Sequence, residues 1–492
     1  MQTKNTAFKG IILFLLILLC IGVAYAAEDT ITDNPNLNDD SLSLAETSVS
    51  LSDSSNLALS QDQDENVIET NSESNLASNE IGEGRNIYVK KDAKDGDGSE
   101  EKPFGDLKSA ISIASDGDTI IVANGSYSGV NNSNLSISQS GLTIKAAEGA
   151  SPSITGSSAR RIFLLTGPNI VLQGLFLTSG RINSNYGGGV LIASDGVTIK
   201  NCTFYNCKAL YGGAVFISGN NIVIDDCEFK SNTAYDSKLT RGGAIYINGG
   251  YENILVNNSR FGVNGYNRAD YGGAIFMSSP AVFNNTVFNN NIADDNGGAF
   301  YVTNTAKNSL FENCSFGNNA AYGRYTSVTG GGAMAIYSTG NRIINSNFTK
   351  NWVSECGGAL MIFRSNNEII NTIFDENKAA KGGAICLRFI SGGINENTSI
   401  IGCNFTSNGK ALPKKELLTK GGAIYSYANK TYILDSKFED NVALSGGAIL
   451  FACDANGNRA NDNTIENSTF SNNQAVRYVV EQSLVQVTEI RF

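Results

Sequence analysis

The chain has 492 residues, enough for several ordinary domains or for one long repeat structure, and it contains no histidine. The lack of histidine excludes Ser-His-Asp and Cys-His nucleophile systems and every metal site that uses imidazole. The net charge of −11 arises near the N-terminus, because residues 27–84 hold fourteen acids and no Lys or Arg, whereas residues 85–492 hold 33 acidic and 34 basic residues. A nearly neutral body argues against nucleic acid as a partner.

Residues 1–26 have the pattern of a signal peptide. Lys4 and Lys9 precede an apolar run over residues 11–23, and Ala24-Tyr25-Ala26 supplies a small-x-small cleavage pattern. An uncleaved N-terminal anchor is the alternative. No second apolar stretch of spanning length follows, so we expect an extracellular or cell-surface protein with no transmembrane helix after the signal.

Residues 27–84 are predicted to be an acidic disordered tail, since this Ser-, Asn- and Asp-rich segment has too little apolar surface to form a core. Residues 85–147 are predicted to form an N-terminal cap and the first coils of a solenoid. There we expect a strand at 87–89, a short amphipathic capping helix at 106–115 with Leu107, Ala110, Ile111 and Ala114 on one face, and a strand at 118–122.

A repeat dominates the rest of the chain, and repeats are interpreted before single motifs. The Gly-Gly pair that marks the repeat recurs in ten copies, starting at Gly187, Gly212, Gly242, Gly272, Gly297, Gly331, Gly357, Gly382, Gly421 and Gly446. A phenylalanine follows each pair, at Phe204, Phe229, Phe261, Phe288, Phe316, Phe348, Phe374, Phe405, Phe438 and Phe470.

Alignment on these two marks separates inward positions from corners. The residues two and four past each Gly pair are apolar with one exception, Ser426, and the residue five before each Phe is apolar in all ten copies. Such period-two patterns indicate strands with one buried face. Three before the Phe, nine of ten residues are Asn or Asp, and three after it nine of ten are Asn, so we interpret both positions as corners and the Gly pair as a third.

Three short strands and three corners per repeat predict a right-handed, single-stranded parallel β-helix over residues 148–473, with stacked Asn and Phe columns. Residues 474–492 contain no further Gly pair and are interpreted either as a C-terminal cap or as a truncated end.

The paired marks, GGA followed by FxxN, resemble the repeats of chlamydial polymorphic outer-membrane proteins. The order of signal, acidic tail, cap and β-helix is similar to that of adhesin-like surface proteins of methanogenic archaea, and residues 103–127 resemble the N-terminal cap of pectate-lyase-like β-helices. The resemblance implies an exported surface protein of adhesin type. Chlamydial members end in an autotransporter β-barrel that this sequence lacks, so we expect no outer-membrane insertion by a barrel of its own.

No catalytic, cofactor-binding or metal-binding residues are predicted. Asp225, Asp226 and Glu228 lie close together in one coil, but the coils on either side do not extend them into an acidic cluster. Four cysteines at the small position two before the Phe are interpreted as core residues, with Cys202 and Cys227 as a candidate disulfide between adjacent coils.

One outward position is apolar and aromatic along the repeat. It lies between the two inward positions that follow each Gly pair, and an exposed stripe of this kind would mark a binding surface. The alternative is that a loop or a terminal segment covers it. The candidate binding stripe consists of Phe216, Tyr246, Phe276, Tyr301, Met361 and Tyr425.

These features together predict a non-catalytic, cell-surface or secreted adhesin-like protein that presents its β-helix to glycans or to proteins on host or neighbouring cells. A polysaccharide lyase or hydrolase on the same fold, and a structural component of a surface layer, are the alternatives.

Overall fold

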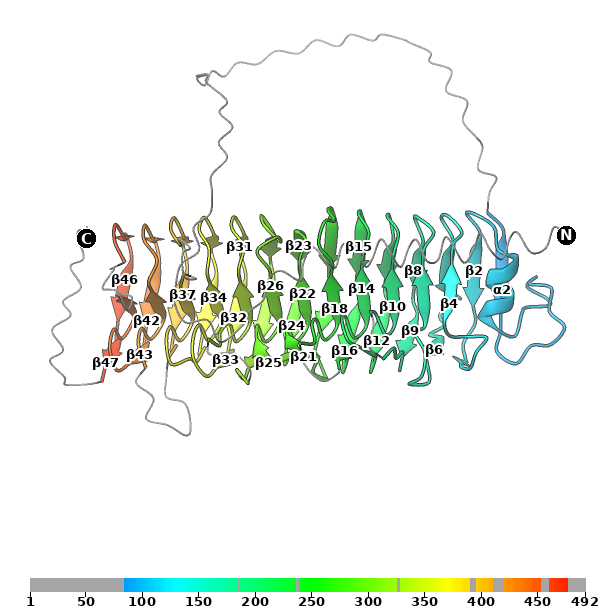
Figure 1. Ribbon diagram of the computed structural model, residues 1–492, viewed down its shortest axis with the longest axis horizontal. Helices are drawn as coiled ribbons and strands as arrows, with labels where there is room; N and C mark the ends of the chain where they lie inside the picture. Colours follow the sequence, from blue (N-terminus) through cyan, green and yellow to red (C-terminus); the bar gives the residue numbers. More distant parts are fainter. Residues whose placement is uncertain are drawn as a thin grey trace, which may run out of the picture. The chain divides into compact units, whose positions relative to one another are not determined.

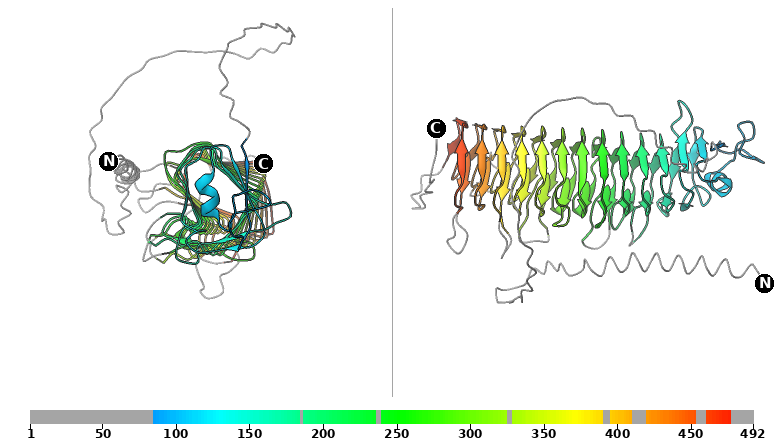
Figure 2. Two further views of the ribbon diagram at one scale, coloured as in Figure 1. Left: turned by 90° about the vertical axis from the view of Figure 1, so that its right-hand side faces the viewer. Right: turned by 90° about the horizontal axis from the view of Figure 1, so that it is seen from above.

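The computed structural model describes residues 84–183, 186–235, 239–324, 328–389, 395–409, 419–452 and 460–476. The predicted signal peptide, the acidic tail and nearly all of the predicted C-terminal segment lie outside these residues. The described chain winds into coils that stack along one axis, which confirms the predicted right-handed parallel β-helix (Figures 1 and 2).

Three long parallel sheets form the faces of the solenoid. A 14-stranded sheet runs from β1 (Asn86–Val89) to β45 (Thr464–Glu466), and a 13-stranded sheet runs from β3 (Ser126–Tyr127) to β46 (Thr469–Ser471). The third, a 12-stranded sheet, contains the strands that follow the Gly pairs. Its strands are β4 (Leu135–Ile137), β7 (Phe163–Leu165), β10 (Val190–Ile192), β14 (Val215–Ile217), β18 (Ile245–Ile247), β22 (Ile275–Met277), β26 (Phe300–Val302), β30 (Met334–Ile336), β34 (Leu360–Ile362), β37 (Ile385–Leu387), β40 (Ile424–Ser426) and β44 (Ile449–Phe451).

A fourth, short sheet at one corner was not predicted. It lies between the Phe strand and the next Gly pair, and we call it the corner sheet. Its strands are β13 (Lys208–Ala209), β17 (Thr233–Ala234), β21 (Arg268–Tyr271), β25 (Ile292–Asn296), β29 (Ala320–Ala321) and β33 (Trp352–Val353). A similar pair, β43 (Val442–Ala443) and β47 (Gln474–Ala475), occurs near the C-terminal end.

The N-terminal end of the stack is closed by α2 (Leu107–Ile113), as Figure 2 shows. Asp106 begins the helix as its N-cap, accepting a hydrogen bond from the backbone N–H of Ser109 at 2.8 Å. Leu107, Ala110 and Ile111 are buried against the first coil, which confirms the predicted capping helix. It ends two residues earlier than predicted, with Ala114 as its C-cap. A covered end leaves no open strand edge.

Two of the three predicted corners have the expected left-handed backbone. The residue three before the Phe has φ near +50°, for example 49° at Asn201 and 50° at Asp226, and the first Gly of each pair has φ between 57° and 70°. The second Gly lies against the next coil, where a Cβ on Gly213 would overlap the carbonyl oxygen of Gly243.

The prediction for the Asn corner was wrong by one position. The left-handed residue comes two after the Phe, as at Ser231 and Lys350, and the Asn that follows turns inward and is buried. In the coil of Phe261 the inward residue is Asn267, while Asn264 is exposed, because three extra residues precede it. These inward residues form an asparagine ladder of Asn232, Asn267, Asn291, Asn319, Asn351, Asn377, Asn408, Asn441 and Asn473.

Every polar atom of a ladder side chain is hydrogen-bonded to a neighbouring coil. The Asn351 Nδ2 atom donates to Asn377 Oδ1 at 3.0 Å and to the Phe316 carbonyl oxygen at 2.9 Å. The Asn351 Oδ1 atom accepts from the backbone N and from Nδ2 of Asn319. Eight of the nine ladder amides are buried, and without these hydrogen bonds their burial would cost at least several kcal/mol in total, so the ladder makes a polar column compatible with a dry core.

The Phe column stacks beside the ladder, as predicted. Adjacent rings from Phe204 to Phe470 have centroids 4.4–5.1 Å apart. Cys202 and Cys227 occupy the small inward position and are both free thiols, so the candidate disulfide between them is not formed. Burial raises the pKa of the Cys202 thiol to about 12, which leaves it protonated and unreactive in the folded protein.

Candidate functional site

The candidate stripe lies on the outer side of the 12-stranded sheet, as its position in the repeat predicts. Phe216, Tyr246, Phe276 and Tyr301 are in register on successive strands β14 to β26. Their rings stack with centroids 4.9, 5.0 and 5.1 Å apart. The parallel register therefore builds a column outside the coil of the same kind as the Phe column inside it.

The stripe is covered, which is the alternative to an exposed binding surface. Phe216, Tyr246, Phe276, Met361 and Tyr425 are each at most 4% exposed. Tyr301 is the one member that remains half-buried. The six side chains form the floor of an outer layer and do not themselves present a surface.

The residue before each Gly pair provides the cover. The left-handed turn at the first glycine lays this residue over the stripe residue of the next coil. Tyr186 packs on Phe216 with centroids 4.5 Å apart, Tyr211 on Tyr246 at 5.5 Å, and Tyr271 on Tyr301 at 5.3 Å, while the Arg241 guanidinium lies 5.1 Å from the Phe276 ring centroid. We call these positions the covering row: Tyr186, Tyr211, Arg241, Tyr271, Asn296, Gly330, Cys356, Lys381, Lys420 and Ser445.

Further aromatic side chains cover the stripe from the other end of the strands. Tyr337 stacks on Tyr301 at 4.9 Å and on Phe363 at 4.5 Å. The Tyr425 hydroxyl donates to the Tyr427 hydroxyl at 2.8 Å, with the two rings at 90°. The outer layer is therefore a second small hydrophobic core with half-buried tyrosines at its surface.

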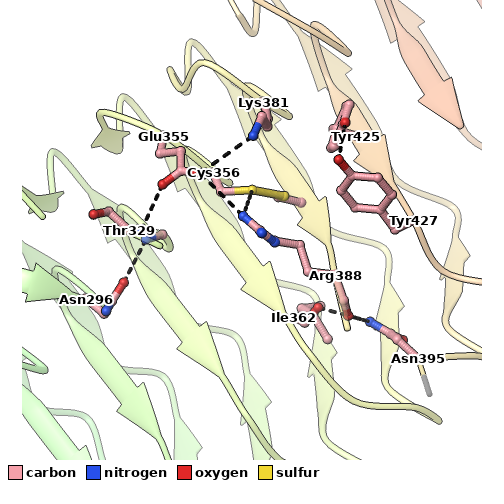
Figure 3. Close-up of a disulfide and its surroundings, with 12 residues drawn as sticks. Asn296, Thr329, Glu355, Cys356, Ile362, Lys381, Arg388, Asn395, Tyr425 and Tyr427 are labelled. Carbon is pink, nitrogen blue, oxygen red and sulfur yellow. Dashed lines mark hydrogen bonds and ion pairs between the residues drawn. A yellow bond between two sulfur atoms is a disulfide. The ribbon is translucent and has the colours of Figure 1, made fainter. Parts of the chain in front are cut away.

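Near the C-terminal end the covering row changes character (Figure 3). Cys356 follows the packing rule of the row and forms a disulfide with Cys386, which holds the stripe position in the next coil. This disulfide was not predicted, because the candidate pair was Cys202 and Cys227, at an interior position of the repeat. An outward disulfide is consistent with an oxidising, extracellular compartment.

Charged groups surround the disulfide. Glu355 Oε1 lies 3.6 Å from Lys381 Nζ and 3.4 Å from Arg388 Nη1, and its Oε2 accepts from the backbone N of Thr329. Asn395 donates through Nδ2 to the carbonyl oxygen of Arg388 at 2.8 Å and so fixes the backbone at the arginine. Figure 3 shows these side chains grouped around the disulfide with Tyr425 and Tyr427 beside them.

An exposed aromatic ridge follows the corner sheet, and sequence reasoning missed it. The side chains of Tyr235, Tyr266 and Tyr322 are 60%, 52% and 42% exposed. Tyr322 contacts the half-buried Trp352, with ring centroids 5.5 Å apart. We call these four residues the tyrosine ridge. Their positions vary between repeats, so alignment on the repeat could not reveal them.

Arginines accompany the ridge. The Arg181 guanidinium lies 5.8 Å from the centroid of Tyr235, and that of Arg324 lies 5.8 Å from Tyr322. Arg268 forms a two-pronged ion pair with Asp294 at 2.7 and 3.0 Å. This hydrogen bonding to Asp294 raises the pKa of Arg268 against the opposing effect of burial. The ridge therefore presents rings and guanidinium groups together.

Two of the three carboxylates considered as an acid/base site are engaged by neighbouring side chains. Asp225 Oδ1 accepts from Nδ2 of Asn257 and of Asn258, and Glu228 pairs with Lys230 at 2.7 Å. Within the described residues, no three acidic or Cys side chains are grouped so that they could hold a metal ion. The same residues include no helix with the length and apolar character needed to span a membrane.

Comparison with known proteins agrees with this architecture. Residues 112–334 and 283–438 match the family model described as "Right handed beta helix region". The chain belongs to the right-handed β-helix family. No curated protein matches this β-helix chain at a significant level.

Solved structures similar to this β-helix include an adhesin and carbohydrate-active enzymes. The Streptococcus pneumoniae surface protein and adhesin PfbA is 14% identical, with a TM-score of 0.43 over 74% of this chain and 94% of PfbA. Pectate lyase Pel9A is 15% identical, with a TM-score of 0.38 over 68% and 80%. The A-module of Azotobacter vinelandii mannuronan C-5 epimerase AlgE6 is 14% identical, with a TM-score of 0.44 over 74% and 94%. At this identity they share the fold alone.

Proposed function

We propose that this protein is a non-catalytic, exported adhesin-like protein whose β-helix presents a binding surface to glycans or to proteins on other cell surfaces. The observation that carries the proposal is the tyrosine ridge, where three tyrosines are more than 40% exposed and two of them have an arginine guanidinium 5.8 Å from the ring centroid. Tyr, Trp and Arg dominate the energetics of recognition surfaces, because they combine a large apolar area with hydrogen-bonding groups.

The covered stripe supports the same role indirectly. It gives the half-buried tyrosines Tyr186, Tyr211 and Tyr337 a packed floor and limits their rotamer freedom. Side chains ordered before binding lose less entropy on contact with a ligand. In this proposal the stripe shapes the surface from below, and the ridge and the half-buried tyrosines make the contacts.

A glycan array and a cell-adhesion assay with the full chain test the proposal. Replacing Tyr235, Tyr266 and Tyr322 together by Ser is expected to weaken binding about tenfold or more, because three exposed rings are lost, while the unfolding midpoint stays unchanged. A matched control replaces Val130, Val282 and Ile373 by Ser, since these side chains are also exposed but lie away from the ridge.

Equal binding by the ridge variant and the control variant would contradict the proposal. A polysaccharide-degradation assay with the same preparations addresses the alternative of a lyase or hydrolase on this fold. New reducing ends or unsaturated products released by the wild-type chain would favour the enzyme. Neither binding nor degradation would favour a structural component of a surface layer.

A further inference from the structure

Two lysines of the covering row lie one above the other. Lys381 and Lys420 hold the same place in adjacent coils and are paired in parallel, with the Gly382 backbone N donating to the Lys420 carbonyl oxygen at 2.8 Å. Like charges at directly opposed positions of a sheet are destabilising. Elsewhere in the row the corresponding places hold Tyr, Arg, Asn, Gly, Cys or Ser, so the repeat does not require lysine there.

A third cation joins them, and among the residues that the structure describes one carboxylate, that of Glu355, pairs with the group. Arg388 and Lys381 share one oxygen of Glu355, at 3.4 and 3.6 Å. Lys420 forms no ion pair with any residue that the structure describes, and its side chain is exposed. Three positive charges against one negative charge leave a local surplus that calls for an external anion.

The cations are held on a rigid support. Lys381 and Arg388 belong to the coil that contains Cys386. The Cys356–Cys386 disulfide bonds this coil to the preceding one (Figure 3). Arg388 Nη1 lies 3.8 Å from the Cys356 Sγ, and Asn395 holds the arginine backbone. The side chains of Lys381 and Arg388 remain 31% and 20% exposed, so a ligand can reach them without unfolding a coil.

We propose that Lys381, Arg388 and Lys420 form an anion-binding site for the carboxylate or sulfate groups of an acidic polysaccharide that lies along the axis of the β-helix. The inference rests on the proposed function and names the ligand class of one part of the surface. Lys381 and Lys420 lie on adjacent coils about 4.8 Å apart, a short spacing that suits a polymer with a charge on each repeating unit. The arginine contributes a planar donor pair that matches a carboxylate or sulfate.

Binding of the full chain to a polyuronate, to a sulfated dextran and to neutral dextran tests the site. We expect the two acidic polymers to bind and neutral dextran to bind at least tenfold more weakly. The double variant Lys381→Gln, Lys420→Gln should lose about tenfold in affinity for the acidic polymers. Its matched control is Lys90→Gln, Lys307→Gln, because these lysines are also exposed and lie elsewhere on the β-helix.

Salt dependence gives a second readout. Raising the salt from about 0.1 M to about 1 M, which shortens the Debye length from about 10 Å to about 3 Å, should weaken wild-type binding more than binding by the double variant. Equal affinity of the double variant and its control for the acidic polymers would overturn the inference. Binding to cells or neutral glycans without binding to acidic polymers would overturn it and leave the proposed function standing. Binding to no polysaccharide and no cell would overturn both, and preference for one acidic polymer would identify the anionic group.

Discussion

The interior of the coils and the outer side of the 12-stranded sheet are built by the same parallel register, yet they differ in what the sequence must supply. Inside, the asparagine ladder and the Phe column repeat one residue type through nearly every coil. Outside, the covering row passes from Tyr211 through Cys356 to Lys420 at one and the same place.

The difference arises from what surrounds each position. An interior side chain is enclosed by its own coil and by both neighbouring coils, so a change of residue type leaves a buried group unsatisfied or a cavity. A covering residue is enclosed on one side only, so a ring, a disulfide or a lysine can close the same place. The constant residue types inside the coils therefore reflect the requirements of the fold. The residue types on the outer side of the sheet can vary, and this variation can encode function.

Asn351→Ala should have the largest effect. The change removes the acceptor for two donors of Asn319 and leaves the Phe316 carbonyl oxygen and Asn377 Oδ1 each without one donor. We expect a loss of about 4 kcal/mol in the free energy of unfolding, measured by urea denaturation. The control is Asn318→Ala next to Asn319, an exposed corner residue; a similar loss there would show that the ladder is not special.

Removal of the disulfide by Cys356→Ser with Cys386→Ser should cost about 3 kcal/mol, because the bond closes a loop with a sequence separation of 30 residues. Urea denaturation with and without reductant measures it. Reductant should destabilise the wild type and leave the double variant unchanged. Cys202→Ser is the matched interior change and should cost less than about 1 kcal/mol, since serine fills the equivalent place in other coils.

Tyr246→Ala tests whether the outer layer is a true packed core. The ring stacks on Phe216 and Phe276 and is covered by Tyr211. We expect a loss of about 2 kcal/mol, less than for a fully enclosed aromatic residue, because water can refill part of the space. Tyr235→Ala on the exposed ridge should leave thermal unfolding unchanged, and a similar shift for both variants would remove the distinction between floor and surface.

Lys420→Tyr should have the smallest effect on stability and the opposite sign. The change introduces tyrosine, the residue type that covers the stripe at several coils of the N-terminal half, into a covering position of the C-terminal half. It also removes the like-charge contact with Lys381. We expect a gain of about 0.5 kcal/mol in the free energy of unfolding. Lys307→Tyr, away from the covering row, should give no gain. A clear destabilisation of Lys420→Tyr would show that the covering places are not interchangeable.

The sequence was sufficient for the architecture because identical residues recur at fixed offsets. The Gly pair, the Phe column and the corner three before the Phe follow from that recurrence. The sequence was insufficient to predict contacts in which a residue's neighbour lies in another coil. Asn232 is directed into the coil because the residue immediately before it, Ser231, has a left-handed backbone conformation. In the coil of Phe261 an insertion moves the buried asparagine from Asn264 to Asn267.

The candidate site was predictable only in part, for the same reason. Alternation along a strand places Phe216 and Tyr246 on the outer side of the sheet, but it cannot show that Tyr186 and Tyr211 fold back over them. The recurring Tyr-Gly-Gly at 186, 211 and 271 was the available signal. The Cys356–Cys386 pairing and the tyrosine ridge depend on residues that do not recur from repeat to repeat. An alignment of the repeats detects only recurring residues, so it could not reveal them.

The disulfide also has a mechanical consequence. Hydrogen bonds between coils run along the axis of the β-helix, so tension along that axis loads successive coil interfaces in series, and an end coil peels away before its neighbours. Peeling from the C-terminal side proceeds one coil at a time until it reaches Cys386, where the disulfide passes the tension directly to Cys356. The residues between Cys356 and Cys386 are therefore bypassed by the force that has unravelled the distal end, and they cannot be extended while the disulfide is intact.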